Sequence, residues 1–351
     1  MSIQIFPFCA VVLSVSVGAA WADTPRIVTD IPPVHSLTAR VMEGVGTPDL
    51  LVDGATSPHD FALRPSQAAA LAEADLVIWV GEALTPALAG SMSALAERAE
   101  LVELMAVEGA VTHAYRESVG GDHDHDHDHD HDHDHDHAAD HGDDTAHDHD
   151  SHAHDDHGHD AHETAAHETA AHDDHHHDHD HSGMDPHGWL DPANAILWTG
   201  VIADRLADMD PANAAVYQAN ARAAEAELTQ LQAEIAERFG AGVQPQFVVF
   251  HDAYQYFETA FGLAPIGAIS LSEAEAPSAA RVAEIRDRIG GLGAICVFAE
   301  PQFDPRIVAA VTEDTPARTA VIDPLGAQLE PGPELYPALM RAMTESFASC
   351  G

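Results

Sequence analysis

Short apolar runs alternate with amphipathic stretches from residue 26 onward, and this alternation predicts a series of βα units. The first half has predicted strands at 27–31, 49–52, 75–80 and 100–104, separated by predicted helices at 34–44, 65–74 and 85–98. The run DLVIWV at 75–80 is apolar throughout, as is typical of a strand that is buried on both faces. These features favour a mostly parallel sheet in this half of the chain.

The same alternation starts again after residue 245. Strands are predicted at 246–250, in the run before Ser270, at 294–298 and at 319–322, and helices at 252–262, 278–289, 304–314 and 333–349. Between the halves, residues 211–239 are rich in Ala, Glu and Gln and contain no Gly, which predicts one helix about 40 Å long. We therefore expect an α/β protein of two βα lobes with mostly parallel sheets, joined by a long rigid helix.

The chain divides into four expected segments: a signal peptide at 1–22, an N-terminal lobe at 23–210, a connecting helix at 211–240 and a C-terminal lobe at 241–351. The first is an uncharged apolar run that ends in a small-x-small cleavage pattern, Ala20-Trp21-Ala22. No Lys or Arg precedes it, so an N-terminal membrane anchor is the alternative. No later stretch has 18 unbroken apolar residues, so we expect a soluble, exported protein.

The charge balance is strongly acidic, with 59 Asp and Glu against 14 basic residues, all of them Arg. Such a surface repels phosphate groups, which excludes a nucleic acid as an expected partner. It attracts divalent cations, although composition alone does not make that attraction specific.

Two cysteines, Cys296 and Cys350, remain after the predicted signal segment. An even number of cysteines in an exported protein predicts a disulfide, with two free thiols as the alternative.

Residues 122–181, called the His tract here, contain 23 of the 28 His of the chain and repeat the dipeptide His-Asp from His123 to His137. Their only common apolar residue is Ala, so we expect the tract to be disordered. Imidazole and carboxylate groups suit zinc, copper and nickel, and a solubilising spacer would not need His. The tract therefore indicates metal capture or sensing, but its many equivalent sites define no geometry.

Five His lie outside the His tract, and four of them stand in ordered contexts: His35, His59, His187 and His251. Three occupy loops or strand ends, His59 between a strand and a helix, His187 before a helix and His251 at the end of QFVVF. Glu300 and Asp323 likewise follow predicted strands. Because open α/β sheets bind ligands beyond the carboxyl ends of their strands, these side chains predict one metal site in the cleft between the lobes.

The mature chain resembles the cluster A-I (cluster 9) solute-binding proteins of metal ABC transporters, and specifically their zinc-binding members. The resemblance runs nearly end to end and is carried by DGATSPHDFALRPSQ, ADLVIWVGE, PHGWLDPANA, VVFHDAYQYFE, CVFAEPQF and IDPLG. It implies a periplasmic protein with zinc held between two lobes. It also implies that Cys296 and Cys350 form the disulfide of the zinc-binding members.

The resemblance places zinc ligands on His59, His187 and His251. Some relatives have a Glu directly before the first ligand His, where this chain has Pro58. Asp323 is therefore our expected fourth ligand, with water as the alternative. Three imidazoles with at most one carboxylate suit tetrahedral Zn²⁺, whereas manganese prefers more oxygen ligands.

Further residues near these positions have expected roles of their own. His35 either lines the site or is structural. Asp60, Asp252 and Glu300 are candidate hydrogen-bond acceptors that would hold the ligand imidazoles in place.

We expect a non-enzymatic, monomeric receptor that captures Zn²⁺ in the periplasm and delivers it to the membrane permease of an ABC importer. No phosphate-binding loop of the form GxxxxGK[ST] is present, so ATP hydrolysis would belong to a partner. The alternatives are a manganese or iron receptor on the same fold, a zinc hydrolase with an open coordination position, and a zinc buffer that engages no permease.

Overall fold

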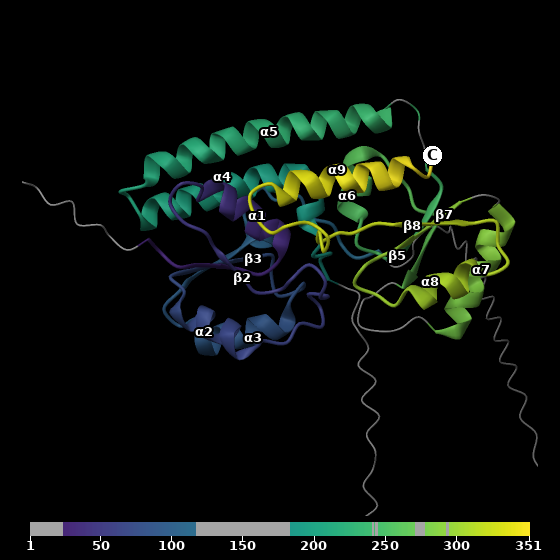
Figure 1. Cartoon of the computed structure of the whole chain (residues 1–351), viewed down its shortest axis with the longest axis horizontal. Coiled ribbons are helices and arrows are strands. Elements are labelled where there is room, and N and C mark those ends of the chain that lie inside the picture. The colour runs from purple at the N-terminus through teal and green to yellow at the C-terminus, as the bar shows by residue number, and fades with distance from the viewer. Residues whose placement is uncertain (1–23, 117–182, 241, 243–244, 271–277, 293–294) are drawn as a thin grey trace, which may run out of the picture. The chain divides into compact units, whose positions relative to one another are not determined.

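The computed structural model describes residues 24–116, 183–240, 242, 245–270, 278–292 and 295–351 (Figure 1). The expected signal peptide and the His tract lie outside these residues. Within the described parts of the chain, no helix is long and apolar enough to cross a membrane.

The first half forms a parallel four-stranded sheet with the order β2-β1-β3-β4. Its strands are β1 (Ile27–Thr29), β2 (Asp49–Leu50), β3 (Leu76–Trp79) and β4 (Glu100–Glu103), and its helices are α1 (Pro32–Val41), α2 (Pro65–Glu73) and α3 (Pro86–Leu95). A short 3-10 helix, η1 (Leu104–Ala106), follows β4. All three α-helices begin with Pro in the first turn, where its missing N–H costs no hydrogen bond.

The second half repeats this topology in a parallel sheet with the order β6-β5-β7-β8. Its strands are β5 (Phe247–His251), β6 (Gly267–Ser270), β7 (Cys296–Ala299) and β8 (Arg318–Val321), and its helices are α6 (Gln255–Phe261), α7 (Ala279–Leu292), α8 (Pro305–Thr312) and α9 (Leu335–Ala348). The predicted fold class, with two parallel sheets, is confirmed.

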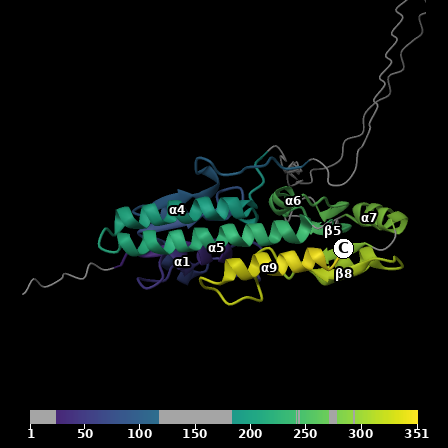
Figure 2. The same ribbon diagram turned by 90° about the horizontal axis from the view of Figure 1, so that it is seen from above.

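Two long helices connect the sheets, α4 (Pro192–Met209) and α5 (Ala214–Gly240). With 27 residues, α5 is about 40 Å long, as expected for the connecting helix. It packs against α4, α1 and α9, which Figure 2 shows running alongside one another. Its buried side chains recur every three or four residues, from Tyr217 to Phe239, and form one apolar stripe.

The two sheets share a hydrophobic core. One cluster extends from Ile27 and Val77 of the first sheet to Phe247 and Val249 of β5. Val248 and Phe250 of β5 belong to a second, smaller cluster, together with side chains of α7 and α8. Alternate side chains of β5 thus face opposite sides of the sheet, both of them apolar. The lobe boundaries given above stay a prediction, because the larger core runs through both halves.

A disulfide joins Cys296 at the start of β7 to Cys350 after α9, as predicted. It closes a loop with a sequence separation of 54 residues. In the chain-entropy view such a closure stabilises the fold by about 4 kcal/mol.

Asp30, the residue after β1, is a fully buried carboxyl group. Its Oδ1 accepts the N–H of Ile31 at 2.8 Å and its Oδ2 accepts the N–H of Val80 at 2.7 Å, which ties the ends of β1 and β3 together. Burial raises the pKa of Asp30 from 3.8 to about 7, although these backbone hydrogen bonds act in the opposite direction.

Replacing Asp30 with Asn should remove a pH dependence of stability. The folded pKa of about 7 lies above the ordinary value of 3.8, so the folded state binds this proton more tightly. The carboxyl group therefore destabilises the fold as the pH rises from about 4 to about 7, by at most about 4 kcal/mol. Urea unfolding of the metal-free protein should show a larger fall in the free energy of unfolding for the native chain than for Asp30→Asn over this range. Equal slopes for the two proteins would contradict this interpretation.

Candidate metal site

His187 is a buried side chain whose ring orientation is fixed by a neighbouring carboxylate. It precedes the 3-10 helix η2 (Gly188–Leu190) and is 4% exposed. Asp185 Oδ1 accepts both the backbone N–H of His187, at 3.0 Å, and its Nδ1–H, at 2.7 Å. Because an ionised carboxylate only accepts, Nδ1 carries the ring proton and Nε2 keeps its lone pair.

The segment around His187 is held by contacts that account for the motif PHGWLDPANA. A Cβ at Gly188 would overlap Sδ of Met105, so any larger residue would displace that side chain. Asn194 donates to the carbonyl of Gly188 at 3.0 Å, and the Trp189 indole donates to the carbonyl of Pro324 at 2.8 Å. The loop that carries His187 is thus fixed to both halves of the chain.

His251 is the last residue of β5 and is 2% exposed. Its Nδ1 lies 2.8 Å from Oε1 of Glu300, the buried residue that follows the neighbouring strand β7. The expected hydrogen bond between Glu300 and the His251 imidazole is therefore present, and the role of His251 as a metal ligand stays a prediction. As at His187, the proton on Nδ1 leaves the Nε2 lone pair for a metal.

His59 lies in the loop between β2 and α2 and is half-buried. Its Nε2 is 3.5 Å from Nε2 of His187, and the two ring centroids are 5.5 Å apart. The ring of His187 is also 5.4 Å from the ring of His251. The fold thus brings together three His that are far apart in the sequence.

These separations are close to those of imidazoles that share one zinc ion. Two nitrogens at about 2.05 Å from a tetrahedral zinc are about 3.3 Å apart, which puts the ring centroids about 5.2 Å apart. The measured values exceed these by a few tenths of an ångström. Correspondingly, no three His, Cys, Asp or Glu side chains of the described residues already converge as closely as a bound metal ion requires. Two of the three ring pairs, His59–His187 and His187–His251, thus lie close to the spacing that a shared zinc ion requires.

Asp323, which follows β8 after one residue, uses both carboxylate oxygens in hydrogen bonds. Oδ1 accepts the N–H groups of Leu325 and Gly326 at 3.0 and 2.9 Å and the amide of Gln302 at 3.1 Å, and Oδ2 accepts the N–H of Ala327 at 2.6 Å. The carboxylate thereby shapes the turn at 323–327. Its role as a zinc ligand stays a prediction.

His35 has a hydrogen bond that fits a structural role. Its Nε2 lies 3.1 Å from the carbonyl oxygen of Pro48, which can only accept, and burial lowers the pKa of the ring. Asp60, one of the acceptors considered above, is exposed. Asp252, another of them, binds the guanidinium group of Arg116.

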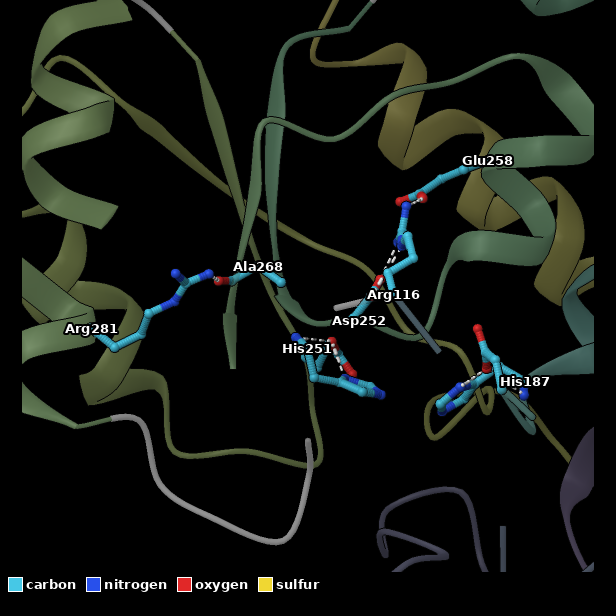
Figure 3. Close-up of polar contacts among 9 residues, drawn as sticks. Arg116, His187, His251, Asp252, Glu258, Ala268 and Arg281 are labelled. Carbon is cyan, nitrogen blue, oxygen red and sulfur yellow. Dashed lines mark hydrogen bonds and ion pairs between the residues drawn. The ribbon is translucent and has the colours of Figure 1, made fainter. Parts of the chain in front are cut away.

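Sequence analysis missed Asp185 and Arg116. The spacing Asp-x-His was a local signal for the first. The second has no such signal, because its partners Asp252 and Glu258 are 136 and 142 residues away. Figure 3 shows Arg116 between these two carboxylates, donating from Nε to Asp252 at 3.0 Å and from Nη1 to Glu258 at 2.8 Å.

This cluster lies beside the candidate site, because Asp252 directly follows His251. Glu258 is 2% exposed, and burial raises its pKa to about 7 although Arg116 acts to lower it. Burial also lowers the pKa of Arg116, but its two carboxylate partners outweigh this and raise it overall. The guanidinium group thus balances two carboxylates in a region of low solvent access.

Two parallel sheets of identical strand order, bridged by a long helix and presenting neutral imidazoles near their strand ends, define a class of metal-binding receptor among the solute-binding proteins. The comparisons agree with this class. The sequence matches the family described as ZnuA, zinc-uptake complex component A, periplasmic, over residues 27–162 and 152–350.

Two relatives are each described as high-affinity zinc uptake system protein ZnuA. That of Paracoccus denitrificans is 44% identical over 97% of both chains, and that of Brucella abortus is 43% identical over 92% of this chain and 91% of its own. A solved zinc-bound deletion mutant of ZnuA has the same fold, with a TM-score of 0.65 at 21% identity over 93% of this chain and 98% of its own.

The chain belongs to the ZnuA family of periplasmic zinc-uptake components. Its function is therefore that of a binding component in zinc uptake and not that of an enzyme, and its place is the periplasm. The predicted family, function and location are confirmed.

Replacing Arg116 with Gln should destabilise the protein by about 3–5 kcal/mol, because two buried carboxylates lose their counter-charge. Arg281 is a matched control: its side chain is 24% exposed against 22% for Arg116, but it pairs with the half-exposed Glu284. Arg281 also donates to the carbonyl of Ala268 at 2.6 Å, so Arg281→Gln should cost about 1–2 kcal/mol, less than Arg116→Gln. The measurement is urea unfolding of both metal-free variants, and equal losses would contradict the assigned role of Arg116.

Proposed function

We propose that this protein captures one Zn²⁺ ion with the Nε2 atoms of His59, His187 and His251 and delivers it to the membrane permease of an ABC importer. The observation that carries the proposal is that the His187 ring contacts the rings of both His59 and His251. Buried carboxylates orient the His187 and His251 rings through Nδ1. Membership of a zinc-uptake family supports zinc as the cargo. The protein acts as a monomer in this proposal.

The donor set supports zinc over manganese or iron. Three neutral imidazoles match the tetrahedral preference of Zn²⁺, whereas Mn²⁺ favours oxygen ligands. A carboxylate ligand would have to come from Asp323, whose oxygens already accept four hydrogen bonds. Three of these hydrogen bonds go to Oδ1 and one goes to Oδ2, so a fourth position filled by Asp323 would use Oδ2.

Aspartate and glutamate partners of the imidazoles support tight capture in a further way. Asp185 and Glu300 hold the two rings in the tautomer and orientation that a metal needs. Their negative charge also offsets part of the positive charge that zinc brings into a buried place.

The His tract has a separate role in this proposal, as a weak collector or buffer of zinc. Its closely spaced His and Asp give many equivalent, loosely defined sites. The tract therefore raises the number of zinc ions that the protein can hold weakly, whereas the three ordered His provide the one tight site.

Competitive zinc titration tests the proposal on a chain that lacks residues 122–181. This shortened chain should retain one tight site. Changing His59, His187 or His251 to Ala should weaken it by more than about 100-fold, beyond the 10–100-fold effect usual for residues that only orient ligands. Mn²⁺ should compete poorly.

The matched control is His35→Gln, which keeps a donor for the Pro48 carbonyl and should leave zinc affinity unchanged. Loss of the tight site on removal of the His tract, or wild-type affinity in the three Ala variants, would overturn the assignment.

A further inference from the structure

A small cavity lies beside His187 and has room for a single water molecule. Its volume is ≈ 10 Å³, and its lining includes Pro58, His187, Glu300 and Gln302. The cavity therefore touches all three parts of the proposed site. His187 is a proposed ligand, Pro58 precedes the proposed ligand His59, and Glu300 orients the ring of His251.

Gln302 contributes an unsatisfied acceptor to this neighbourhood. Its Nε2 donates to the carbonyl of Gly54 at 2.7 Å and to Oδ1 of Asp323 at 3.1 Å. Both partners are acceptors, so they fix which branch of the amide is the NH₂ group. The other branch, Oε1, is buried and has no hydrogen-bond partner among the described residues. A buried amide oxygen normally accepts a hydrogen bond, and where no protein group donates it, an ordered water molecule does.

The same side chain holds the loop that carries His59. Gly54 approaches the turn at 323–327 so closely that a Cβ on it would lie 2.9 Å from Cα of Ala327. Gln302 donates to both sides of this contact, to the carbonyl of Gly54 and to Oδ1 of Asp323. The position of Gln302 therefore depends on both the His59 loop and the turn formed by Asp323.

We propose that Gln302 is a positioning residue of the zinc site: its Oε1 accepts a hydrogen bond from the water molecule that completes the coordination of zinc by His59, His187 and His251. The inference rests on the proposed function. A zinc-bound water is a strong donor and needs a fixed acceptor to be held in one orientation. The Gln302 carbonyl oxygen supplies that acceptor, and its amide nitrogen stays on Gly54 and Asp323.

Two substitutions separate this role from simple attachment of the loop. Gln302→Leu removes the acceptor and both donations. Gln302→Glu keeps an oxygen acceptor but loses the donations and sets a carboxylate against Asp323. If Gln302 orients the water, the Glu variant binds zinc more tightly than the Leu variant, which should be at least about 10-fold weaker than wild type. If Gln302 only attaches the loop, the Glu variant is equal to the Leu variant or weaker, and the inference is wrong.

Both variants are measured by competitive zinc titration in the chain lacking 122–181, with Gln218→Leu as the control. Gln218 is a glutamine of α5 that bonds to the exposed Asp204, so its loss should leave affinity unchanged. Wild-type affinity in Gln302→Leu would overturn this inference and leave the three-His site standing. Absence of a tight site in the unmutated shortened chain would instead overturn the proposed function.

A crystal structure of the zinc-loaded wild-type protein gives a test that does not depend on the variants folding. We expect a zinc-bound water within hydrogen-bond distance of Gln302 Oε1. Coordination of zinc by Asp323 or another protein side chain in that position would overturn the inference.

Discussion

The hydrogen bonds from the His187 and His251 rings to Asp185 and Glu300 are the interactions on which the rest of the site depends. Each carboxylate is buried and accepts from Nδ1, so Nε2 is the atom that would bind the proposed zinc ion. Without them each ring could rotate or take the other tautomer. Parallel strands supply this geometry at little cost, because the ends of β5 and β7 place His251 and Glu300 side by side although they are 49 residues apart.

Charge is the second constraint. The chain carries a formal charge of −45, and buried carboxylates accumulate close to the imidazoles. These negative charges attract a divalent cation. In the metal-free protein, however, the carboxylates repel one another. Arg116 lies between Asp252 and Glu258 and offsets part of the repulsion between them. Asp252 directly follows His251, so this compensation lies next to the proposed site. The proposed site thus keeps a negative surrounding, while Arg116 offsets two of its buried carboxylates.

Sequence pattern predicted the parallel sheets, α5, the disulfide and the three His, because each of these depends on local periodicity, on spacing or on motifs with fixed neighbours. The groups that hold the site were harder to foresee. Arg116 binds Asp252, which is 136 residues away, and Gln302 donates to the backbone carbonyl of Gly54, which is 248 residues away. No local sequence pattern indicates contacts of this kind. Asp323 stands at the strand end where the sequence expects it, but the turn after it uses its oxygens. The shared core of the two halves also follows from tertiary packing and is invisible in the alternation of strands and helices.

The central claim is that three imidazoles, and not the His tract, hold the transported ion. X-ray absorption at the zinc edge, on the chain lacking 122–181 and loaded with one equivalent of zinc, tests it most directly. The account predicts four nitrogen or oxygen neighbours at about 2.0–2.1 Å, of which three give the multiple-scattering signature of imidazole. A spectrum with fewer than three imidazoles, or one dominated by carboxylate oxygens, would contradict it.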